Sequence, residues 1–226
     1  MTNRLLGKKN DINTTISYSQ TPTPYHAVIA QEIVKSFKDG EIFDHGCGVG
    51  NTLIELERLA PESYKYTLSD IDPNCLKIAQ AHLNVEKTYL ISEDGVLPII
   101  DDKFDAVISS HVVHYDKHFD TTIRQLISMV RPGGLFVLAV PNAMTLPLFF
   151  NALIRKKHST APIIAWDIAA FTNLLSVLDL AEVDIMTDYA PLPFLTRYKF
   201  FKPVERALVK LFPGLGFSLI AKCTVK

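Results

Sequence analysis

The sequence predicts an α/β protein, a doubly wound sheet of mainly parallel strands with helices on both faces. The first observation is the apolar pair Ile42-Phe43, which leads into a turn with three alternating glycines. The second is the segment 52–60, where apolar residues recur at the spacing of a helix with one buried face. The third is a second strand at 64–69, followed by the helix-start signal Asp72-Pro73. Strand, turn, helix and strand in this order form a βαβ unit.

The turn after the first strand suits close contact with a ligand. Asp44 ends the strand, and Gly46, Gly48 and Gly50 follow it at every second position. Glycine permits positive φ and has no Cβ, so a ligand can lie against bare backbone there. A dinucleotide fingerprint would need glycine at the position of Asn51, and this disfavours a nicotinamide-dependent oxidoreductase.

An acidic residue stands at the tip of the second strand. The strand 64–69 closes on Asp70, which lies 20 residues beyond Gly50. A carboxylate in this place can accept two hydrogen bonds from the hydroxyls of a ribose. Asp72 is a good N-cap, and Pro73 suits the first turn of the helix that follows.

These two segments resemble the cofactor-binding motifs of class I methyltransferases that use S-adenosylmethionine (SAM). The resemblance rests on Asp44-His-Gly-Cys-Gly-Val-Gly50 and on Ser69-Asp-Ile-Asp-Pro-Asn-Cys-Leu-Lys-Ile-Ala79. It implies a Rossmann-like fold of seven strands, with the last strand antiparallel between the fifth and the sixth. It also implies SAM as cofactor, S-adenosylhomocysteine (SAH) as product, and no metal. The residues expected at the cofactor are Asp44, Gly46, Cys47, Gly48, Gly50, Asn51, Asp70, Ile71, Glu93, Asp94, Ser110, His111 and Tyr18.

The third strand, 85–91, ends in a turn that contains two acids. In the family that the chain resembles, an acid or amide in this turn faces the adenine amine, and Glu93 or Asp94 would take that role. Ligands of such sheets bind in the crevice at the carboxyl ends of the strands, which favours this interpretation. The alternative is that both side chains are solvated loop charges.

The fourth strand, 104–110, runs into His111, His114 and His118. The resemblance places this strand end closest to the transferred methyl group. His111 or His114 would then be a general base, because histidine titrates near neutral pH. The alternative is that they are polar loop residues without a chemical role. A metal site is not expected, because the segment follows a strand directly and no separate acid cluster offers a fourth ligand.

The second half of the chain completes the sheet. Arg131-Pro-Gly-Gly134 resembles the family's turn before the fifth strand, and the apolar run 135–140 is typical of a strand buried on both faces. The basic cluster 155–158 is either a solvated face or a surface for an anionic acceptor. The other expected elements are helices at 119–130, 144–154, 166–178 and 203–212, and an antiparallel strand pair at 181–186 and 217–224. The helix 203–212 would be a substrate lid, an interfacial helix or a helix packed on the sheet edge.

The segment before the first strand contains polar residues 1–20 and an expected helix at 25–37. In the resembled family such a segment covers the cofactor or the substrate. Tyr18 and Tyr25 would then donate a hydrogen bond to the methionine carboxylate, or they are packing aromatics. We expect one domain over 1–226, with a flap and helix at 1–38, a cofactor-binding half at 39–142 and substrate-side elements at 143–226.

Composition limits the partners. The 226 residues carry a formal net charge of −1, so no general attraction to nucleic acid or membrane follows. The three cysteines are scattered, which fits a reduced, cytoplasmic compartment better than a disulfide framework. Residues 1–20 lack the apolar core of a signal peptide. The uncharged stretch 135–154 is interrupted by prolines and asparagines, so no membrane span is expected.

The functional hypothesis is transfer of a methyl group from SAM to a small-molecule acceptor. Oxygen is slightly favoured as the acceptor atom, because histidines flank the expected methyl position. Nucleic-acid methylation is disfavoured by the charge, and Ser109-Ser-His-Val112 stands where amino-methylating DNA enzymes carry their signature. The alternative is a SAM-binding protein that does not methylate, since binding motifs do not separate the two.

Overall fold

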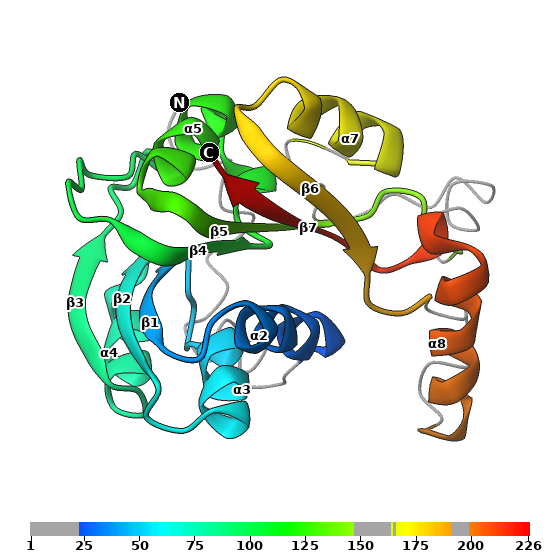
Figure 1. Cartoon of the computed structure of the whole chain (residues 1–226), viewed down its shortest axis with the longest axis horizontal. Coiled ribbons are helices and arrows are strands. Elements are labelled where there is room, and N and C mark those ends of the chain that lie inside the picture. The colour runs from blue at the N-terminus through cyan, green and yellow to red at the C-terminus, as the bar shows by residue number, and fades with distance from the viewer. Residues whose placement is uncertain (1–22, 147–163, 165, 191–198) are drawn as a thin grey trace.

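In the computed structural model, the described residues are 23–146, 164, 166–190 and 199–226. They form one sheet of seven strands in the order β3-β2-β1-β4-β5-β7-β6 (Figure 1). The strands are β1 (Gly40–His45), β2 (Tyr64–Asp70), β3 (Val85–Leu90), β4 (Phe104–Ser110), β5 (Val130–Pro141), β6 (Leu180–Thr187) and β7 (Ser218–Val225). Neighbours among the first five pair in parallel, whereas β7 is antiparallel to β5 and β6. The predicted Rossmann-like sheet with an inserted antiparallel strand is confirmed.

Three predicted features lie outside the described residues. They are Tyr18, most of the expected helix 144–154 and the basic cluster 155–158. Within the described ranges, no helix is long and apolar enough to cross a membrane.

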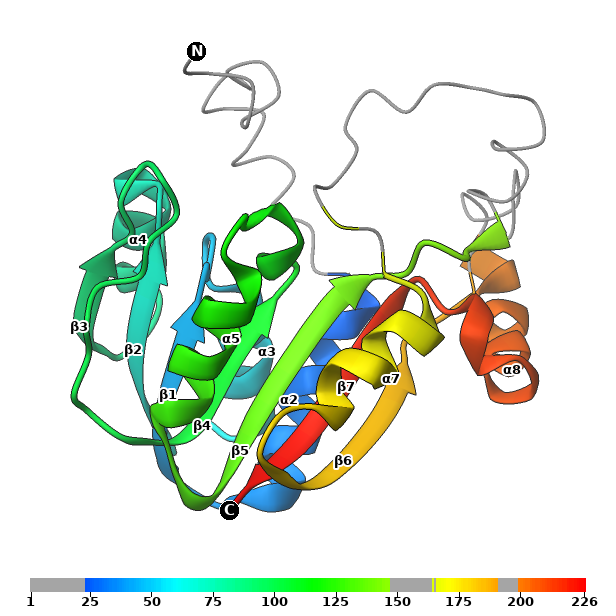
Figure 2. The same cartoon turned by 90° about the horizontal axis from the view of Figure 1, so that it is seen from above.

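Two layers of helices sandwich the sheet. One layer is α2 (Pro24–Ser36), α3 (Asn51–Leu59) and α4 (Pro73–Gln80), and the other is α5 (Phe119–Ser128) and α7 (Ile168–Ser176) (Figure 2). Ile42 of β1 packs into the core under the first layer, and its neighbour Phe43 packs into the core under the second. Successive side chains of a strand point to opposite faces, so each central strand supplies both cores.

β5 starts earlier than predicted, because the turn before it is a bulge within the strand. Phe104 pairs with Val130, and the next pair joins Ala106 to Leu135, so residues 131–134 bulge out of the ladder. Gly133 there has a φ of 76°, in the left-handed region that glycine tolerates. The run after the bulge is buried on both faces, as its unbroken apolar sequence indicates.

The predicted start of α4 is confirmed. Asp72 is the N-cap, its carboxylate accepts a hydrogen bond from the Asn74 backbone N–H at 2.9 Å, and Pro73 occupies the first turn. α3 starts differently, since its N-cap Gly50 is in a left-handed conformation with a φ of 85°. The glycine turn therefore leads directly into the first turn of α3.

α8 (Lys202–Leu211) follows β6 and lies outside the two helix layers (Figures 1 and 2). The side chain of Glu205 is fully buried and pairs with Lys202, whereas Phe200, Val204 and Leu211 are exposed. The short 3₁₀ turns are η1 (Val113–Tyr115), η2 (Lys199–Phe201) and η3 (Pro213–Leu215).

Candidate active site

A cavity of about 190 Å³ lies at the carboxyl ends of β1 and β4. Its walls are the first turn of α2, the glycine loop between β1 and α3, the start of α3 and residues 110–112. The order of the sheet reverses between β1 and β4, since the chain proceeds outward from β1 through β2 to β3 and then returns to β4. Ligands of open α/β sheets bind at such a switch point.

The cavity brings together about half of the residues that were predicted to bind the cofactor. Those that line it are Asp44, Gly46, Cys47, Gly48, Asn51, Ser110 and His111. Gly50, Asp70, Ile71, Glu93 and Asp94 do not line it. Glu93 and Asp94 are exposed in the turn after β3, so their role toward an adenine ring stays a prediction.

Gly48 is the point at which the backbone faces the cavity without a side chain. A Cβ built on Gly48 would meet no atom within 4 Å, whereas a Cβ on Gly46 would lie 2.3 Å from the Val112 side chain. Both residues have positive φ, at 55° and 67°. Gly46 is therefore required by packing, and Gly48 leaves room for a ligand against the main chain.

Asp70 holds the glycine loop in place. Its carboxylate accepts the Gly48 N–H at 2.7 Å and the Asp72 N–H at 2.8 Å. Burial raises the pKa of Asp70, and these backbone hydrogen bonds lower it in part. A carboxylate oxygen can accept more than one hydrogen bond, so a ribose contact stays compatible with this position. The contact from Asp70 to the loop was not predicted.

Asp44 is a buried carboxylate on the wall of the cavity. Only 3% of its surface is exposed. Burial, and then the nearby charge of Asp70, raise the pKa of Asp44 to about 8. A cationic ligand group beside Asp44 would favour its ionised form. The hydroxyls of Thr23 and Ser110 also line the cavity and, among the described residues, complete no hydrogen bond, although both lie near the Tyr25 phenol.

The two candidate bases differ in position. His111 lines the cavity and stacks on Tyr25 with ring centroids 4.2 Å apart, whereas His114 sits in η1, buried away from the cavity lining. Burial lowers the pKa of His111 to about 3 and that of His114 to about 4. His118 is exposed at the start of α5. Within the described part of the chain, no group of three or more metal-ligating side chains is present.

Two residues from the far end of the chain reach the same site, and the sequence did not predict them. Nε2 of His111 lies 3.0 Å from Oγ of Ser218, the first residue of β7. Ser218 Oγ in turn lies 3.3 Å from Oδ2 of Asp188, just after β6. β7 pairs with β5 so that Ser218 is opposite Pro141 at the end of that strand. The insertion of β7 between β5 and β6, antiparallel to both, thus brings Ser218 and Asp188 to the switch point.

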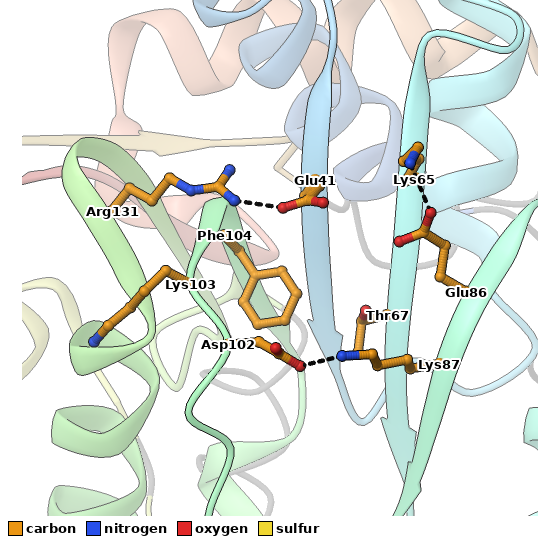
Figure 3. A pocket seen from close by; sticks show the side chains of 9 residues that line it. All are labelled: Glu41, Lys65, Thr67, Glu86, Lys87, Asp102, Lys103, Phe104 and Arg131. Atoms are coloured by element: carbon orange, nitrogen blue, oxygen red, sulfur yellow. Dashed lines mark hydrogen bonds and ion pairs between the residues drawn. The ribbon is translucent and has the colours of Figure 1, made fainter.

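A second cavity, of about 180 Å³, lies at the opposite edge, where β1 to β5 begin (Figure 3). Its charged side chains are engaged with one another or with the backbone. The interactions are the ion pairs Lys65–Glu86, Lys87–Asp102 and Arg131–Glu41 and the hydrogen bond from Lys103 to the Ser128 carbonyl. The charges that line this second cavity are therefore already engaged.

The glycine loop, the acid at the tip of β2 and the cavity at the switch point define a nucleotide-binding α/β protein of the class I methyltransferase type. A family model described as a methyltransferase domain matches residues 20–222. The chain therefore belongs to this methyltransferase domain family, within the SAM-dependent methyltransferases of class I.

The similar proteins agree with this assignment. The biotin biosynthesis bifunctional protein BioCD of Bordetella avium is 36% identical over 100 residues, 43% of this chain, and the chain spans 21% of that protein. A SAM-dependent methyltransferase of Thermotoga maritima, a possible histamine N-methyltransferase, has a TM-score of 0.69 at 13% identity over 96% of both chains. The plantazolicin methyltransferase BpumL in complex with SAH has a TM-score of 0.61 at 15% identity over 96% and 92%. At these identities the structural likeness establishes the fold.

Proposed function

We propose that the protein transfers a methyl group from SAM to the oxygen of a small-molecule acceptor, with His111 taking the acceptor's proton. The observation that carries this proposal is one cavity in which bare backbone at Gly48, the carboxylate of Asp44 and the imidazole of His111 meet. The net charge of −1 does not favour a nucleic-acid substrate.

The residues at the cavity fit SAM. Bound SAM would supply a methyl group on a positively charged sulfur, which is a good leaving group. Asp44 offers the negative charge that a sulfonium or an ammonium group needs, and the hydroxyls of Thr23 and Ser110 offer free hydrogen-bonding capacity. Asp70 and Gly48 shape the loop on which the nucleoside part would lie. Glu93, Asp94 and Ile71 would complete the adenine and ribose contacts.

His111 is a better candidate for the proton acceptor than His114. Its ring lines the cavity, and its low pKa keeps the ring nitrogen free of the second proton at neutral pH. Burial makes this imidazole a weaker base than a free histidine, so the more acidic phenols and enols suit it better than alcohols. His114 does not line the cavity, and its buried ring packs against the rings of His111 and Tyr115, which favours a structural role.

The test combines binding with labelled-methyl transfer. Calorimetry should give micromolar-range binding of SAM and SAH and no measurable binding of NAD. A panel of phenols, enols, alcohols, amines and carbon acids should then give transfer to an acidic hydroxyl. The panel includes histamine, because of the possible function of the Thermotoga protein.

Two variants locate the base within this test. His111→Ala should lower turnover by about 10²–10⁴-fold with SAM binding intact, and His114→Ala should keep it within a few-fold. Transfer to an amine or a carbon with His111→Ala fully active would overturn the oxygen assignment. SAM binding without transfer to any acceptor would favour a non-methylating SAM-binding protein.

A further inference from the structure

His111, Ser218 and Asp188 form a hydrogen-bonded chain that leads from the cavity into the protein. His111 Nε2 and Ser218 Oγ are 3.0 Å apart, and Ser218 Oγ and Asp188 Oδ2 are 3.3 Å apart. The other carboxylate oxygen of Asp188 accepts the backbone N–H groups of Ser218 at 2.9 Å and of Tyr189 at 2.8 Å. Three donors therefore converge on one buried carboxylate.

The direction of these hydrogen bonds follows from the number of protons. Burial raises the pKa of Asp188, and the hydrogen bonds from the Ser218 and Tyr189 backbone and from the Ser218 hydroxyl lower it in part. These donors favour the ionised carboxylate, which only accepts, and a serine hydroxyl has one proton to donate. Hydrogen bonds to an ionised acceptor are the stronger ones, so the Ser218 proton goes to Asp188. Ser218 Oγ is then an acceptor, and Nε2 of His111 must carry the ring proton. Nδ1 is left with its lone pair, and no described residue donates a hydrogen bond to it.

The ring of His111 also packs against two aromatic rings. It stacks on Tyr25 at an interplanar angle of 7°, and the centroid of the Phe217 ring lies 6.1 Å from its own. The backbone of His111 has a φ of 56°, a left-handed conformation that is strained for a residue other than glycine. Its N–H is bound to the Ala139 carbonyl at 2.8 Å. A strained residue that is fixed this firmly is typical of a functional site.

We propose that Ser218 and Asp188 are positioning residues, which hold the His111 proton on Nε2 and present the unprotonated Nδ1 to a hydroxyl acceptor. This inference rests on the proposed function. As the O–CH₃ bond forms and the S–CH₃ bond breaks, the acceptor's proton passes to Nδ1. The positive charge leaves the sulfur and appears on the imidazole, so the number of protons and the total charge are conserved.

The direct test is ¹⁵N NMR of the His111 ring in the full chain at neutral pH, assigned with His111→Gln. The wild type should show Nε2 as the protonated nitrogen and Nδ1 as the unprotonated one. In Asp188→Asn, the new amide donates to Ser218 Oγ, the serine proton turns to Nε2, and the ring proton should move to Nδ1. Ser218→Ala should give a mixture of both tautomers. A matched control is Asp184→Asn, which removes an exposed charge from β6.

Turnover with a hydroxyl acceptor is the second readout. Asp188→Asn and Ser218→Ala should lower kcat by about 10²-fold or more, with KM and SAM affinity unchanged, and Asp184→Asn should have no effect. An Nδ1-protonated wild type, an unchanged tautomer in Asp188→Asn, or full kcat in both variants would overturn the proposal. A wild type without methyl transfer would overturn the proposed function instead, and the NMR result would still decide the tautomer.

Discussion

Asp44, on the wall of the cavity, has a pKa close to neutral pH. Its pKa of about 8 means that the free protein holds a proton there at pH 7. A cationic ligand needs the ionised form, so binding of SAM should release about one proton. Affinity should rise by up to about tenfold per pH unit between roughly pH 6 and 7. Calorimetry in buffers of different ionisation enthalpy measures the release, and Asp44→Asn should abolish it. Binding of SAM by the wild type without proton release would contradict this role.

The same carboxylate makes stability depend on pH. Burial raises its pKa in the folded state, so folded Asp44 holds its proton more tightly than unfolded Asp44. The stability that protonated Asp44 contributes is fully present below about pH 4, which is the pKa of Asp44 in the unfolded chain. It is lost as the pH rises toward about 8, the pKa in the folded protein. Asp44→Asn should therefore gain stability relative to the wild type between pH 5 and pH 8, as measured by urea unfolding. If Asp44→Asn and the wild type differed in stability by the same amount at pH 5 and at pH 8, Asp44 would already be ionised in the folded protein at pH 5.

Asp70 holds the glycine loop by a hydrogen bond from the Gly48 N–H and is also the residue expected to bind the ribose. Asp70→Ala leaves the partly buried N–H groups of Gly48 and Asp72 without their acceptor, which should cost about 1–3 kcal/mol of unfolding free energy. SAM affinity should fall at least about tenfold, since 1.4 kcal/mol corresponds to that factor. The control is Asp72→Asn, which keeps a good N-cap and should change neither quantity. Unchanged SAM affinity in Asp70→Ala would exclude Asp70 from the site.

Substitutions in the glycine loop allow an effect on stability to be measured apart from an effect on SAM binding. Gly48→Ala places a Cβ in open space and adds only the strain of a positive φ, about 1–2 kcal/mol. Gly133→Ala is a matched control, because it also has positive φ and open space but lies at the bulge before β5. Both variants should lose similar stability in thermal unfolding, and only Gly48→Ala should lose SAM affinity. Gly46→Ala should be less stable than either, because its Cβ meets Val112.

The elements near the loop could be predicted from the sequence because their signals are local. The glycines, the cap at Asp72 and the apolar run of β5 each act within a few residues. Ser218 and Asp188 carry no such signal, since Ser218 lies 107 positions from His111 and 30 from Asp188. Only the three-dimensional insertion of β7 brings them together. The bulge at 131–134 was missed for a related reason, because only its pairing with β4 distinguishes it from a turn.

At the scale of the molecule, burial is uneven across the sheet. The central strands β4, β5 and β7 are buried along most of their length, whereas β3 and β6 are partly exposed at the edges. Local opening needs less free energy where fewer apolar contacts are lost. In hydrogen exchange followed by mass spectrometry, amides of β4, β5 and β7 should exchange most slowly and those of β3 and β6 faster. Equal protection in all seven strands would contradict this gradient.

The position of β7 also has a consequence for synthesis on the ribosome. β7 is the last of the seven described strands in sequence, yet it fills the place between β5 and β6. Until residues 218–225 have emerged, β5 exposes a row of unpaired backbone groups along a strongly apolar strand, and β6 has no neighbour to join. An open apolar edge of this kind invites pairing with other nascent chains. Completion of the sheet at β7 therefore covers this apolar edge of β5.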